Sequence, residues 1–546
     1  MPLSFKFSKS ILSTISPPIP TAYKWIPKSK STRTSPNLEV LDMSQGVPGT
    51  APHPILQQSL RETSARSDAW GYCPAEGEWK LREVLAREMR GTYGYGKRKV
   101  DISPEDIAIT SGCNLAFVAT VMAIADAGDE VILPVPWYFN HQMTLTLLGV
   151  TPVPLITSPE SSFLPSPTLA STLITSKTRA IALVTPNNPT GAVYPPSLIA
   201  QFAKLAKENG LALILDETYR DFIVGSDDSS DTIERPHGLF DTTESESEAE
   251  SEDHSGGSMA SDDIDKHLPW RSTLISLYSF SKSYRIPGHR LGAITASPEL
   301  LKEIGKVLDT LQICAPRVPQ LALAKEFDGS ISVGSRSQLR SPPLTTPGTP
   351  GEPPESEVKL DSALGGHGVS LQESMIAVSS LKSASSLEKE VEETISVLAA
   401  LKSDILSTSL AIHARQRLFK DTLEKEAPNW KVVSQGAYYA FVQHPFLSQS
   451  SEDVCQKLVE EVGVRVLPGS FFFDKDLDIT ESSFSSMKSQ PELNSGLSFK
   501  SKLNELDRYI RFSVANVSDE KVVKVCRRLG EAERVFKEEF GWVVGG

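Results

Sequence analysis

The feature that most constrains the fold is an alternation of short apolar runs with longer amphipathic stretches between residues 76 and 311. The apolar runs contain few polar positions, which is typical of strands buried on both faces. Strands that alternate with helices form a sheet covered by helices on both faces. We therefore predict an α/β fold with a mostly parallel sheet. The predicted strands lie at residues 131–133, 179–185, 211–215, 273–280 and 290–296, and the predicted helices at 76–90, 112–125, 197–208 and 298–311.

The pattern changes after residue 395, where a long helix is predicted over residues 395–426. Short strands and a final helix that starts at Ser518 follow, which predicts a smaller α+β domain. The strands are predicted at residues 431–433, 438–442, 464–467 and 509–514. We expect an N-terminal arm and part of the small domain at 1–75, a large domain at 76–328 and the rest of the small domain at 329–546.

Three low-complexity stretches interrupt this pattern. Residues 225–270 contain 14 acidic and two basic residues, including the run Ser-Glu-Ser-Glu-Ala-Glu-Ser-Glu-Asp. Residues 329–385 are rich in Ser, Pro and Gly, and residues 474–503 are rich in Ser. Segments of this composition bury too little apolar surface to offset the entropy of ordering the chain. We predict that all three are disordered insertions or surface excursions.

The charge and cysteine distributions exclude several classes of function. The formal net charge is −13, and residues 225–270 account for most of it, so the acidity belongs to one segment. No basic stripe indicates a nucleic-acid partner. No apolar run reaches the roughly 18–20 residues that span a bilayer. The five cysteines form no C-x-x-C pair and no Cys/His cluster, so neither a disulfide framework nor a metal site is predicted.

A lysine directly follows a predicted buried strand. Lys282 lies after the strand at 273–280, at the kind of strand end where α/β sheets bind ligands. A partly buried lysine has a lowered pKa and can form a Schiff base with an aldehyde. Ser279 and Ser281 can hydrogen-bond a phosphate, and the planar guanidinium of Arg290 can bind the same group. Taken alone, Lys282 is equally compatible with an exposed lysine in a serine-rich loop.

Two further motifs place polar groups at neighbouring strand ends. Asp216 ends the apolar strand at 211–215. A carboxylate buried there needs a cationic partner, and a protonated pyridine nitrogen would serve. Tyr219, and Asn188 in the turn Pro-Asn-Asn-Pro-Thr-Gly, can each hydrogen-bond a phenolate oxygen. Taken alone, an acidic helix cap or a salt bridge to an arginine is an alternative for Asp216, and an ordinary Pro/Asn turn is the simpler explanation of the Asn188 motif.

A helix start and an aromatic cluster complete the set. Gly112, Cys113 and Asn114 begin a predicted helix, where backbone N–H groups and the helix dipole favour a phosphate. A glycine-led helix start is common, so this signal is weak alone. Tyr138 follows the strand at 131–133 and can stack on a flat heterocycle, with its neighbour Trp137 as the alternative. Core packing explains at least two of the three adjacent aromatic rings.

As a set, the motifs resemble one family. Asn-Pro-Thr-Gly, Asp-x-x-Tyr, Ser-x-Ser-Lys with an arginine eight residues on, and a late Arg-Phe-Ser follow the order of the class I/II pyridoxal-phosphate aminotransferases, which have the aspartate aminotransferase fold (fold type I). The resemblance covers roughly residues 36–225, 270–328 and 395–540. It implies pyridoxal 5′-phosphate as cofactor and amino transfer between an α-amino acid and a 2-oxo acid, a reaction of amino acid metabolism.

The resemblance implies a role for each candidate. Lys282 resembles the Schiff-base lysine that also moves the proton between the substrate Cα and the cofactor. Asp216 resembles the partner of the pyridinium nitrogen. Asn188 and Tyr219 resemble the pair that contacts the ring oxygen, and Tyr138 resembles the stacking aromatic. The residues that resemble the phosphate ligands are Gly112, Cys113, Asn114, Ser279 and Arg290.

Three more residues match the family outside these motifs. Arg511 resembles the arginine that binds the substrate α-carboxylate with two hydrogen bonds. Gly46 resembles the glycine whose backbone meets that carboxylate. Tyr72 resembles the tyrosine that reaches the phosphate of the other subunit, which implies a homodimer with sites at the interface. The sequence departs from the family in the gap of 66 residues between Asp216 and Lys282, about twice the usual length, and the acidic segment explains the excess.

Two alternative functions stay open at this point. The same motifs serve β- or γ-elimination in enzymes that resemble aminocyclopropane-carboxylate synthases and C–S lyases. A cofactor-binding scaffold regulated through the acidic segment is the second alternative, because Ser245, Ser247 and Ser251 lie among acids and can be phosphorylated. A solvated loop explains that segment more simply.

The N-terminal segment bears on localisation. Residues 1–38 carry six Lys or Arg and no acid, like a transit peptide. However, the first arginine is Arg33, and the run Pro-Pro-Ile-Pro that begins at Pro17 interrupts any early helix. We therefore expect a cytoplasmic protein, with an organellar address as the alternative.

Overall fold

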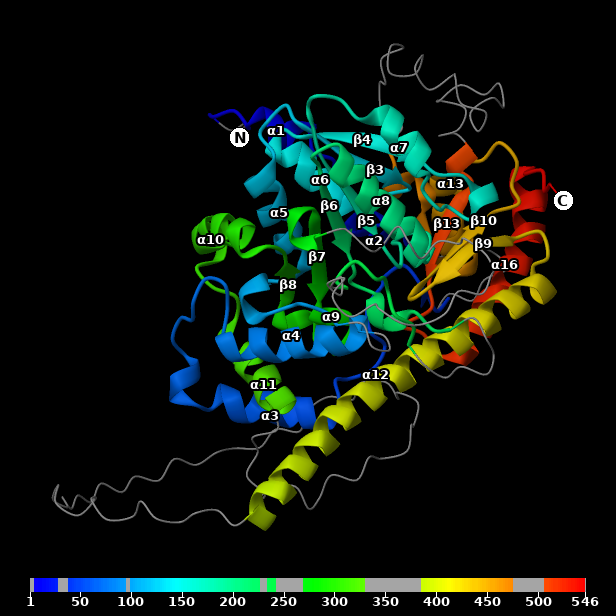
Figure 1. Ribbon diagram of the computed structural model, residues 1–546. Coiled ribbons are helices and arrows are strands. Elements are labelled where there is room, and N and C mark those ends of the chain that lie inside the picture. The colour runs from blue at the N-terminus through cyan, green and yellow to red at the C-terminus, as the bar shows by residue number, and fades with distance from the viewer. Residues whose placement is uncertain are drawn as a thin grey trace, which may run out of the picture.

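The computed structural model describes residues 4–27, 38–94, 99–225, 233–241, 269–328, 384–474 and 505–545, with side chains of the long helix from residue 399. The predicted segment 329–385, apart from its last two residues, and nearly all of 474–503 lie outside the described residues. Among the described residues, no helix combines the length and apolar composition that crossing a membrane requires. Figure 1 shows a large central sheet and a smaller sheet beside it.

Within the described residues, a seven-stranded sheet has the order β2-β8-β7-β6-β5-β3-β4. Only β8 runs antiparallel to its neighbours β2 and β7, and the other pairs are parallel. The predicted α/β class with a mostly parallel sheet is therefore confirmed. The strands are β2 (Ile107–Thr110), β3 (Glu130–Val135), β4 (Thr151–Ile156), β5 (Thr178–Val184), β6 (Ala212–Asp216), β7 (Leu274–Ser279) and β8 (Gly292–Thr295).

Successive side chains of the strands point to opposite faces, and helices cover both faces. Ile214 packs in one cluster with α5, α6 and α10, whereas Leu213 and Leu215 pack in another with α4, α7 and α8. This two-sided burial explains why the strands read as continuous apolar runs. The helices are α4 (Trp79–Tyr93), α5 (Cys113–Ile124), α6 (Phe139–Leu148), α7 (Pro167–Leu173), α8 (Pro196–Glu208) and α10 (Pro298–Gln312).

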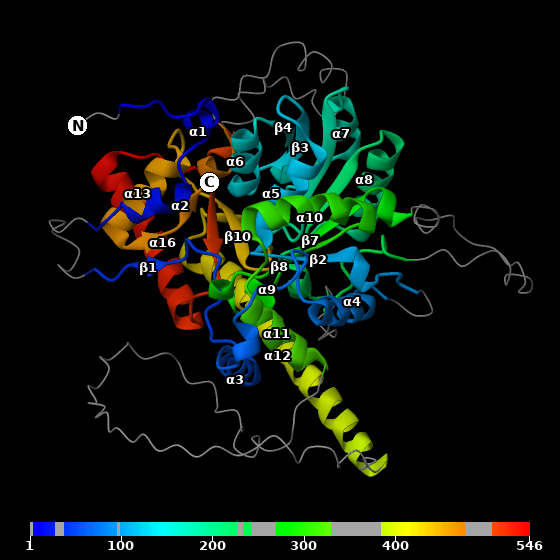
Figure 2. The same cartoon turned by 90° about the vertical axis from the view of Figure 1, so that its left-hand side faces the viewer.

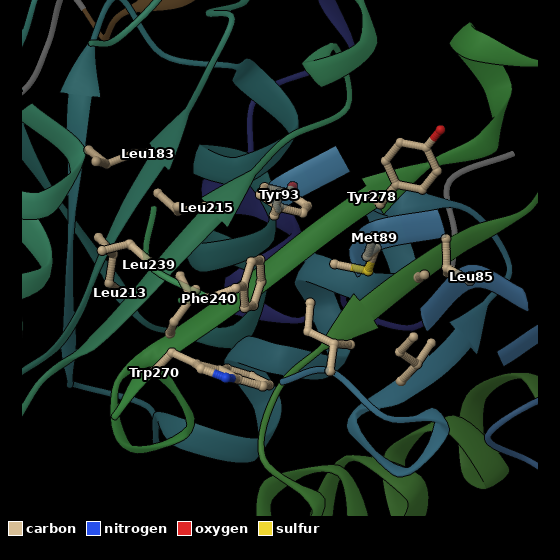
Figure 3. Packing of buried hydrophobic residues seen from close by; sticks show 14 of the residues in the cluster. Leu85, Met89, Tyr93, Leu183, Leu213, Leu215, Leu239, Phe240, Trp270 and Tyr278 are labelled. Atoms are coloured by element: carbon tan, nitrogen blue, oxygen red, sulfur yellow. The ribbon is translucent and has the colours of Figure 1, made fainter. Parts of the chain in front are cut away.

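Two sequence-based expectations need correction in this sheet. The strand predicted to stop at Leu133 continues through Pro134, which lies opposite Leu155 of β4. The predicted disorder over 225–270 is wrong for residues 233–241, in which His237, Leu239 and Phe240 are buried. Phe240 is fully buried, and its ring meets that of Trp270 at 5.0 Å with an interplanar angle of 79°. Figure 3 shows both rings inside the cluster with Leu239 and Leu213.

A four-stranded sheet with the order β12-β13-β10-β9 forms the smaller unit of the described chain. The strand predicted over 464–467 is wrong as a single element, because Val464 pairs with Leu41 of β1 while Leu467 pairs with Arg511 of β13. The short strands are β1 (Leu41–Asp42), β9 (Lys431–Gly436), β10 (Tyr439–Gln443), β11 (Val464–Arg465), β12 (Leu467–Pro468) and β13 (Tyr509–Ser513).

Helices pack this smaller sheet and connect it to the larger one. The long helix α12 (Ala384–Glu426) contacts both α11 (Arg317–Asp328) and α16 (Asp519–Phe540). Its side chains Ile412, Phe419 and Leu423 join the small-sheet core, whereas Ile405 joins the core of the large sheet. The remaining helices are α1 (Lys9–Ser13), α2 (Pro18–Tyr23), α3 (Pro54–Ser64), α9 (Phe280–Ser283) and α13 (Ser451–Val462).

Candidate active site

A cavity of about 260 Å³ lies at the carboxyl ends of the central strands and reaches the small sheet. Residues that follow β5, β6 and β7 line it, together with the first residues of α5 and α6 and with Arg511 of β13. This is the edge at which parallel sheets bind ligands. The predicted site residues that line the cavity are Gly46, Cys113, Asn114, Tyr138, Asn188, Asp216, Tyr219, Ser279, Ser281, Lys282, Arg290 and Arg511.

Two predicted site residues do not line the cavity. Gly112 lies immediately before α5, close enough that an added Cβ would sit 2.1 Å from an Arg290 Nη atom. Tyr72 is 77% exposed and lies with the exposed Trp70 on the outer surface. Trp137, the alternative to Tyr138, is buried in the core and does not line the cavity.

Lys282 lies in the short helix α9, which Ser279 caps by accepting a hydrogen bond from the Ser281 N–H. The Lys282 Nζ donates to the Gly46 carbonyl oxygen at 2.5 Å. Burial, together with the positive charges of Arg511 and Arg290, lowers the pKa of Lys282 to about 8. An amine with this pKa exchanges its proton near neutral pH, as a nucleophile or base in catalysis must.

Asp216 is buried at the end of β6 and has three hydrogen-bonding partners. Its Oδ1 accepts from the Thr218 N–H at 3.0 Å and from the Thr218 hydroxyl at 2.7 Å. Its Oδ2 lies 3.2 Å from His141 Nε2. Burial alone would raise the pKa of Asp216, but the hydrogen bond and charge of His141 and the Thr218 contacts hold it below its ordinary value. The carboxylate is therefore ionised at neutral pH.

His141 was not among the sequence-predicted site residues. It packs flat against Phe117, with ring centroids 3.8 Å apart and an interplanar angle of 14°. The only sequence signal was its position three residues after Tyr138, the residue that precedes α6, which places the two side chains on the same side of the helix. Its contact with Asp216 joins two distant segments, so the local pattern carried no information about it.

Phenolic and amide groups surround the middle of the cavity. The hydroxyls of Tyr219 and Tyr439 lie 2.6 Å apart. Tyr138 donates to the Asn114 Oδ1 at 3.2 Å and accepts from the Asn140 amide at 2.8 Å. Burial, followed by the neighbouring Tyr439, raises the pKa of Tyr219 well above its ordinary value, so Tyr219 stays a hydrogen-bond donor. Tyr439 was missed because sequence showed it only as an apolar position of a strand.

The start of α5 forms one end of the cavity. Gly112 has a φ of +88°, which an L side chain rarely adopts, and it leaves room for the Arg290 guanidinium. The free N–H groups of the first helical turn and this guanidinium face the same space as the Ser279 and Ser281 hydroxyls. These groups are the donors that bind a phosphate.

Arg511 forms the opposite side of the cavity, from the small sheet. Its guanidinium donates to the Asn188 Oδ1 at 2.8 Å and to the Ser44 carbonyl oxygen. Its Nε has no hydrogen-bond partner among the described residues. Burial lowers the pKa of Arg511, although it stays a cation. No carboxylate in the described part of the chain pairs with it. Gly46 lies nearby, where an added Cβ would be 2.0 Å from the Tyr439 hydroxyl.

The family described as aminotransferase class I and II matches residues 39–338. The chain belongs to this family. Its members are pyridoxal-phosphate-dependent transaminases. The matched range contains the ends of β5, β6 and β7 and therefore Asn188, Asp216 and Lys282.

Curated relatives are similar over part of their length. The chain is 27% identical over 298 residues to the aspartate aminotransferase of Thermotoga maritima, which covers 54% of the chain and 68% of the relative. It is 35% identical over 165 residues to the aspartate/prephenate aminotransferase of Thermus thermophilus, which covers 30% of the chain and 42% of the relative. In four further matches to similar aminotransferases, counting the Thermus thermophilus protein, the chain spans between about two fifths and two thirds of the relative's length.

Solved structures share the fold over nearly the whole chain. A double mutant of the Thermus thermophilus aspartate aminotransferase superposes with a TM-score of 0.64 at 18% identity and covers 96% of this chain and 99% of its own. The aromatic aminotransferase of Pyrococcus horikoshii has a TM-score of 0.60 at 20% identity, with 92% and 96% covered. At this identity the likeness shows the fold alone.

Proposed function

We propose that this protein is a pyridoxal-phosphate-dependent aminotransferase that moves an amino group from an α-amino acid to a 2-oxo acid in amino acid metabolism. The observation that carries the proposal is that Lys282 of α9, which follows the large sheet, and Arg511 of the small sheet line one cavity with the buried carboxylate of Asp216. The names of the relatives favour transfer over elimination, because those compared here are aminotransferases.

The residues around the cavity fit this cofactor. The cradle at Gly112, which a Cβ would fill, and the guanidinium of Arg290 suit a phosphate. The ionised Asp216 suits a protonated ring nitrogen, and the lone Nε donor of Arg511 suits a substrate carboxylate. The proposed cofactor ligands are Tyr72 of a second subunit, Gly112, Cys113, Asn114, Tyr138, Asn188, Asp216, Tyr219, Ser279, Ser281, Lys282 and Arg290.

In this proposal Lys282 and Arg511 have different roles in the cavity: Lys282 transfers a proton and Arg511 binds the substrate. When bound, pyridoxal phosphate supplies an aldehyde for amines and a ring that accepts electrons from the substrate Cα. Lys282 holds and moves the proton at Nζ, which its lowered pKa permits near neutral pH. Arg511 would bind the α-carboxylate with two parallel hydrogen bonds beside the Gly46 backbone and so hold the substrate in the cavity that Lys282 lines.

The proposal also covers the domain organisation, the localisation and the oligomeric state. We propose a cofactor-binding domain at 76–328 and a smaller domain from 1–75 and 329–546, because the large and small sheets have separate core clusters. We also propose a cytoplasmic homodimer. Exposed Trp70 and Tyr72, at 72% and 77%, support an interface on that face, since large exposed aromatic rings commonly mark contacts.

The test compares wild type with Lys282→Ala and with Lys306→Ala, an exposed lysine paired with Glu303. Purified wild type and Lys306→Ala should show the visible absorbance of lysine-bound cofactor, lose it with borohydride, and turn over an amino acid with a 2-oxo acid. Lys282→Ala should lose both properties. A Lys282→Ala protein that keeps them would refute the proposal. Repeated turnover without any added 2-oxo acid, beyond one equivalent of product per site, would show elimination instead.

A further inference from the structure

The residue three positions after Lys282 has an unusual backbone conformation. Arg285 follows α9 and has a φ of +56°, in the left-handed region that L side chains rarely adopt. Helices commonly end with a glycine at this position, because glycine takes this conformation without strain. Arg285 is also buried, at 7% exposed. A strained conformation persists only where the surrounding contacts hold it, and such positions gather at functional sites.

Three hydrogen bonds hold the Arg285 guanidinium. Its Nη2 donates to the Asp404 Oδ2 at 2.5 Å and its Nη1 donates to the Thr408 hydroxyl at 2.6 Å. Asp404 and Thr408 lie one turn apart on the same side of α12. Its Nε donates to the Ala51 carbonyl oxygen at 2.7 Å. The guanidinium therefore joins the end of α9 to the segment before α3 and to α12, which lies next to α9 in Figure 2.

The segment that contains Ala51 also contacts the amine of Lys282. The Gly46 carbonyl oxygen in this segment accepts a hydrogen bond from Lys282 Nζ at 2.5 Å. The Arg285 backbone N–H in turn donates to the Lys282 carbonyl oxygen at 3.3 Å. The hydrogen bonds of Arg285 and Lys282 thus close a ring between two segments that are far apart in the sequence. Within this ring the side chain of Arg285 holds one end and the amine of Lys282 holds the other.

The helix α12 extends these contacts to the small sheet. Its side chains Ile412 and Phe419 pack in the core of that sheet, which also carries Arg511. Arg285 therefore binds the same helix that supports the arginine proposed to hold the substrate carboxylate. A substrate held by Arg511 can exchange a proton with Lys282 only if the two side chains keep their separation, because the rate between positioned groups depends on their geometry.

We infer that Arg285 is a positioning residue that holds Lys282 where its amine meets the cofactor aldehyde. This inference rests on the proposed function and deepens it. Arg285 does not line the cavity, and it acts through the backbone of Lys282 and through the segment from Gly46 to Ala51. The nitrogen of the neutral Lys282 amine forms the C=N bond with the aldehyde carbon, and the aldehyde oxygen leaves as water with the two amine protons.

The test measures how fast the apo protein binds pyridoxal 5′-phosphate through Lys282, from the rise in visible absorbance of the lysine-bound cofactor. In Arg285→Gly and Arg285→Ala the rate constant should fall about 10- to 100-fold, since misplacing a reacting group by about 1 Å can cost about 100-fold. The affinity of the apo proteins for inorganic phosphate should stay at the wild-type value, because Gly112 and Arg290 are unchanged. Arg285→Lys keeps the charge but not the planar fork, so its rate should lie between those of Arg285→Gly and wild type.

Two comparisons separate positioning from general stability. Alanine keeps the strained φ and glycine relieves it, so Arg285→Ala should unfold at a lower urea concentration than Arg285→Gly, although both lose the same hydrogen bonds. A positioning role predicts equal rates in these two variants, whereas a purely structural role predicts a slower rate in Arg285→Ala. Arg271→Gln is the matched control, because Arg271 binds Asp101 and Asp106 across distant segments and does not line the cavity. It should lose stability and keep the wild-type rate.

The rate at which lysine-bound cofactor forms decides the inference. A wild-type rate in Arg285→Gly, or an equal fall in Arg271→Gln, would overturn it and leave the proposed function intact. Wild-type protein that forms no lysine-bound cofactor would remove the proposed function and the inference with it. If neither Arg285→Gly nor Arg285→Ala folds, Asp404→Asn and Thr408→Val each remove one partner on the half-buried side of α12, and each should slow the reaction by up to about tenfold. Unchanged rates in both of these would also overturn the inference.

Discussion

Two buried arginines have opposite surroundings. Arg511 lies at the cavity, and Arg220 lies in a group of buried ion pairs with Glu88 and Asp221. Arg220 lies four residues after Asp216 and is 1% exposed. Its guanidinium lies 2.6 Å from Glu88 and 3.7 Å from Asp221. It also stacks 3.9 Å above the Tyr278 ring. Arg511 is equally buried at 2% exposed, but its acceptors are the neutral Asn188 and a backbone carbonyl.

The pKa values follow from this difference. Burial acts to lower the pKa of both guanidiniums. For Arg220 the charge of Glu88 and its other neighbours outweigh burial and raise the pKa well above its ordinary value, whereas for Arg511 burial prevails and the pKa falls. A buried cation that lacks an anion is costly. The comparison indicates that Arg220 stabilises the fold, whereas Arg511 has no carboxylate partner among the described residues, which fits its proposed role in binding the substrate carboxylate.

The largest expected effect on stability is at Arg220. Arg220→Gln leaves Glu88 and Asp221 buried without their cation, which should lower the free energy of unfolding by about 3–5 kcal/mol, as the loss of one partner from a buried pair does. Urea unfolding of the apo protein measures this loss. Arg179→Gln, which breaks the surface pair with Asp129, is the control and should cost less than about 1 kcal/mol. Equal losses in the two variants would contradict a structural role for Arg220.

Arg511→Gln should show the opposite profile. Two charge-assisted hydrogen bonds to the substrate carboxylate are lost, so kcat/KM should fall about 100- to 1,000-fold. The free energy of unfolding should stay the same or rise, because a buried cation without a carboxylate is removed. Steady-state kinetics and urea unfolding on the same preparation check both statements. A loss of stability comparable to that of Arg220→Gln would erase the distinction between the two arginines.

A third variant extends the comparison to Arg290. Gly112→Ala would place a methyl group 2.1 Å from its guanidinium, so cofactor affinity should fall about tenfold or more, as the loss of a charge-assisted hydrogen bond predicts. Gly210→Ala is the control, because Gly210 also has a positive φ, of +65°, but has no atom within 4 Å of the added Cβ. Both variants should lose about 1–2 kcal/mol of stability from backbone strain. Equal cofactor affinity in both variants would show that the start of α5 at Gly112 does not bind the cofactor phosphate.

The smallest effect is a pH dependence from Lys282. Its pKa of about 8 in the folded apo protein lies below the ordinary lysine value near 10.4, so between these values the unfolded chain binds more protons and stability rises with pH. Below pH 8 the buried charge opposes folding. Lys282→Met should therefore be more stable than wild type at pH 7, and the difference should shrink as the pH is raised from 8 toward 10. A constant difference would indicate that Lys282 has an ordinary pKa.

The sequence was most informative where a reactive or charged residue directly follows an apolar strand. Asp216 and Lys282 were predicted as site residues because each stands directly after a buried apolar strand, and parallel strands bring such ends together. Arg511 was predicted from its family motif alone. His141 and Tyr439 escaped prediction, since a histidine in a helix and a tyrosine in a strand look like core residues until their partners are known.

The sequence by itself determined the α/β class, the carboxyl ends of β5, β6 and β7 to within one residue, and most of the polar residues around the cavity, because apolar periodicity and short motifs are local properties. Only the tertiary structure decided that Phe240 is buried in the core, that Ile19 reaches the cavity, and that Arg511 lacks a carboxylate partner among the described residues. Each of these joins segments far apart in the chain. Long-range contacts depend on how two sheets are placed in space, and no local pattern records that placement.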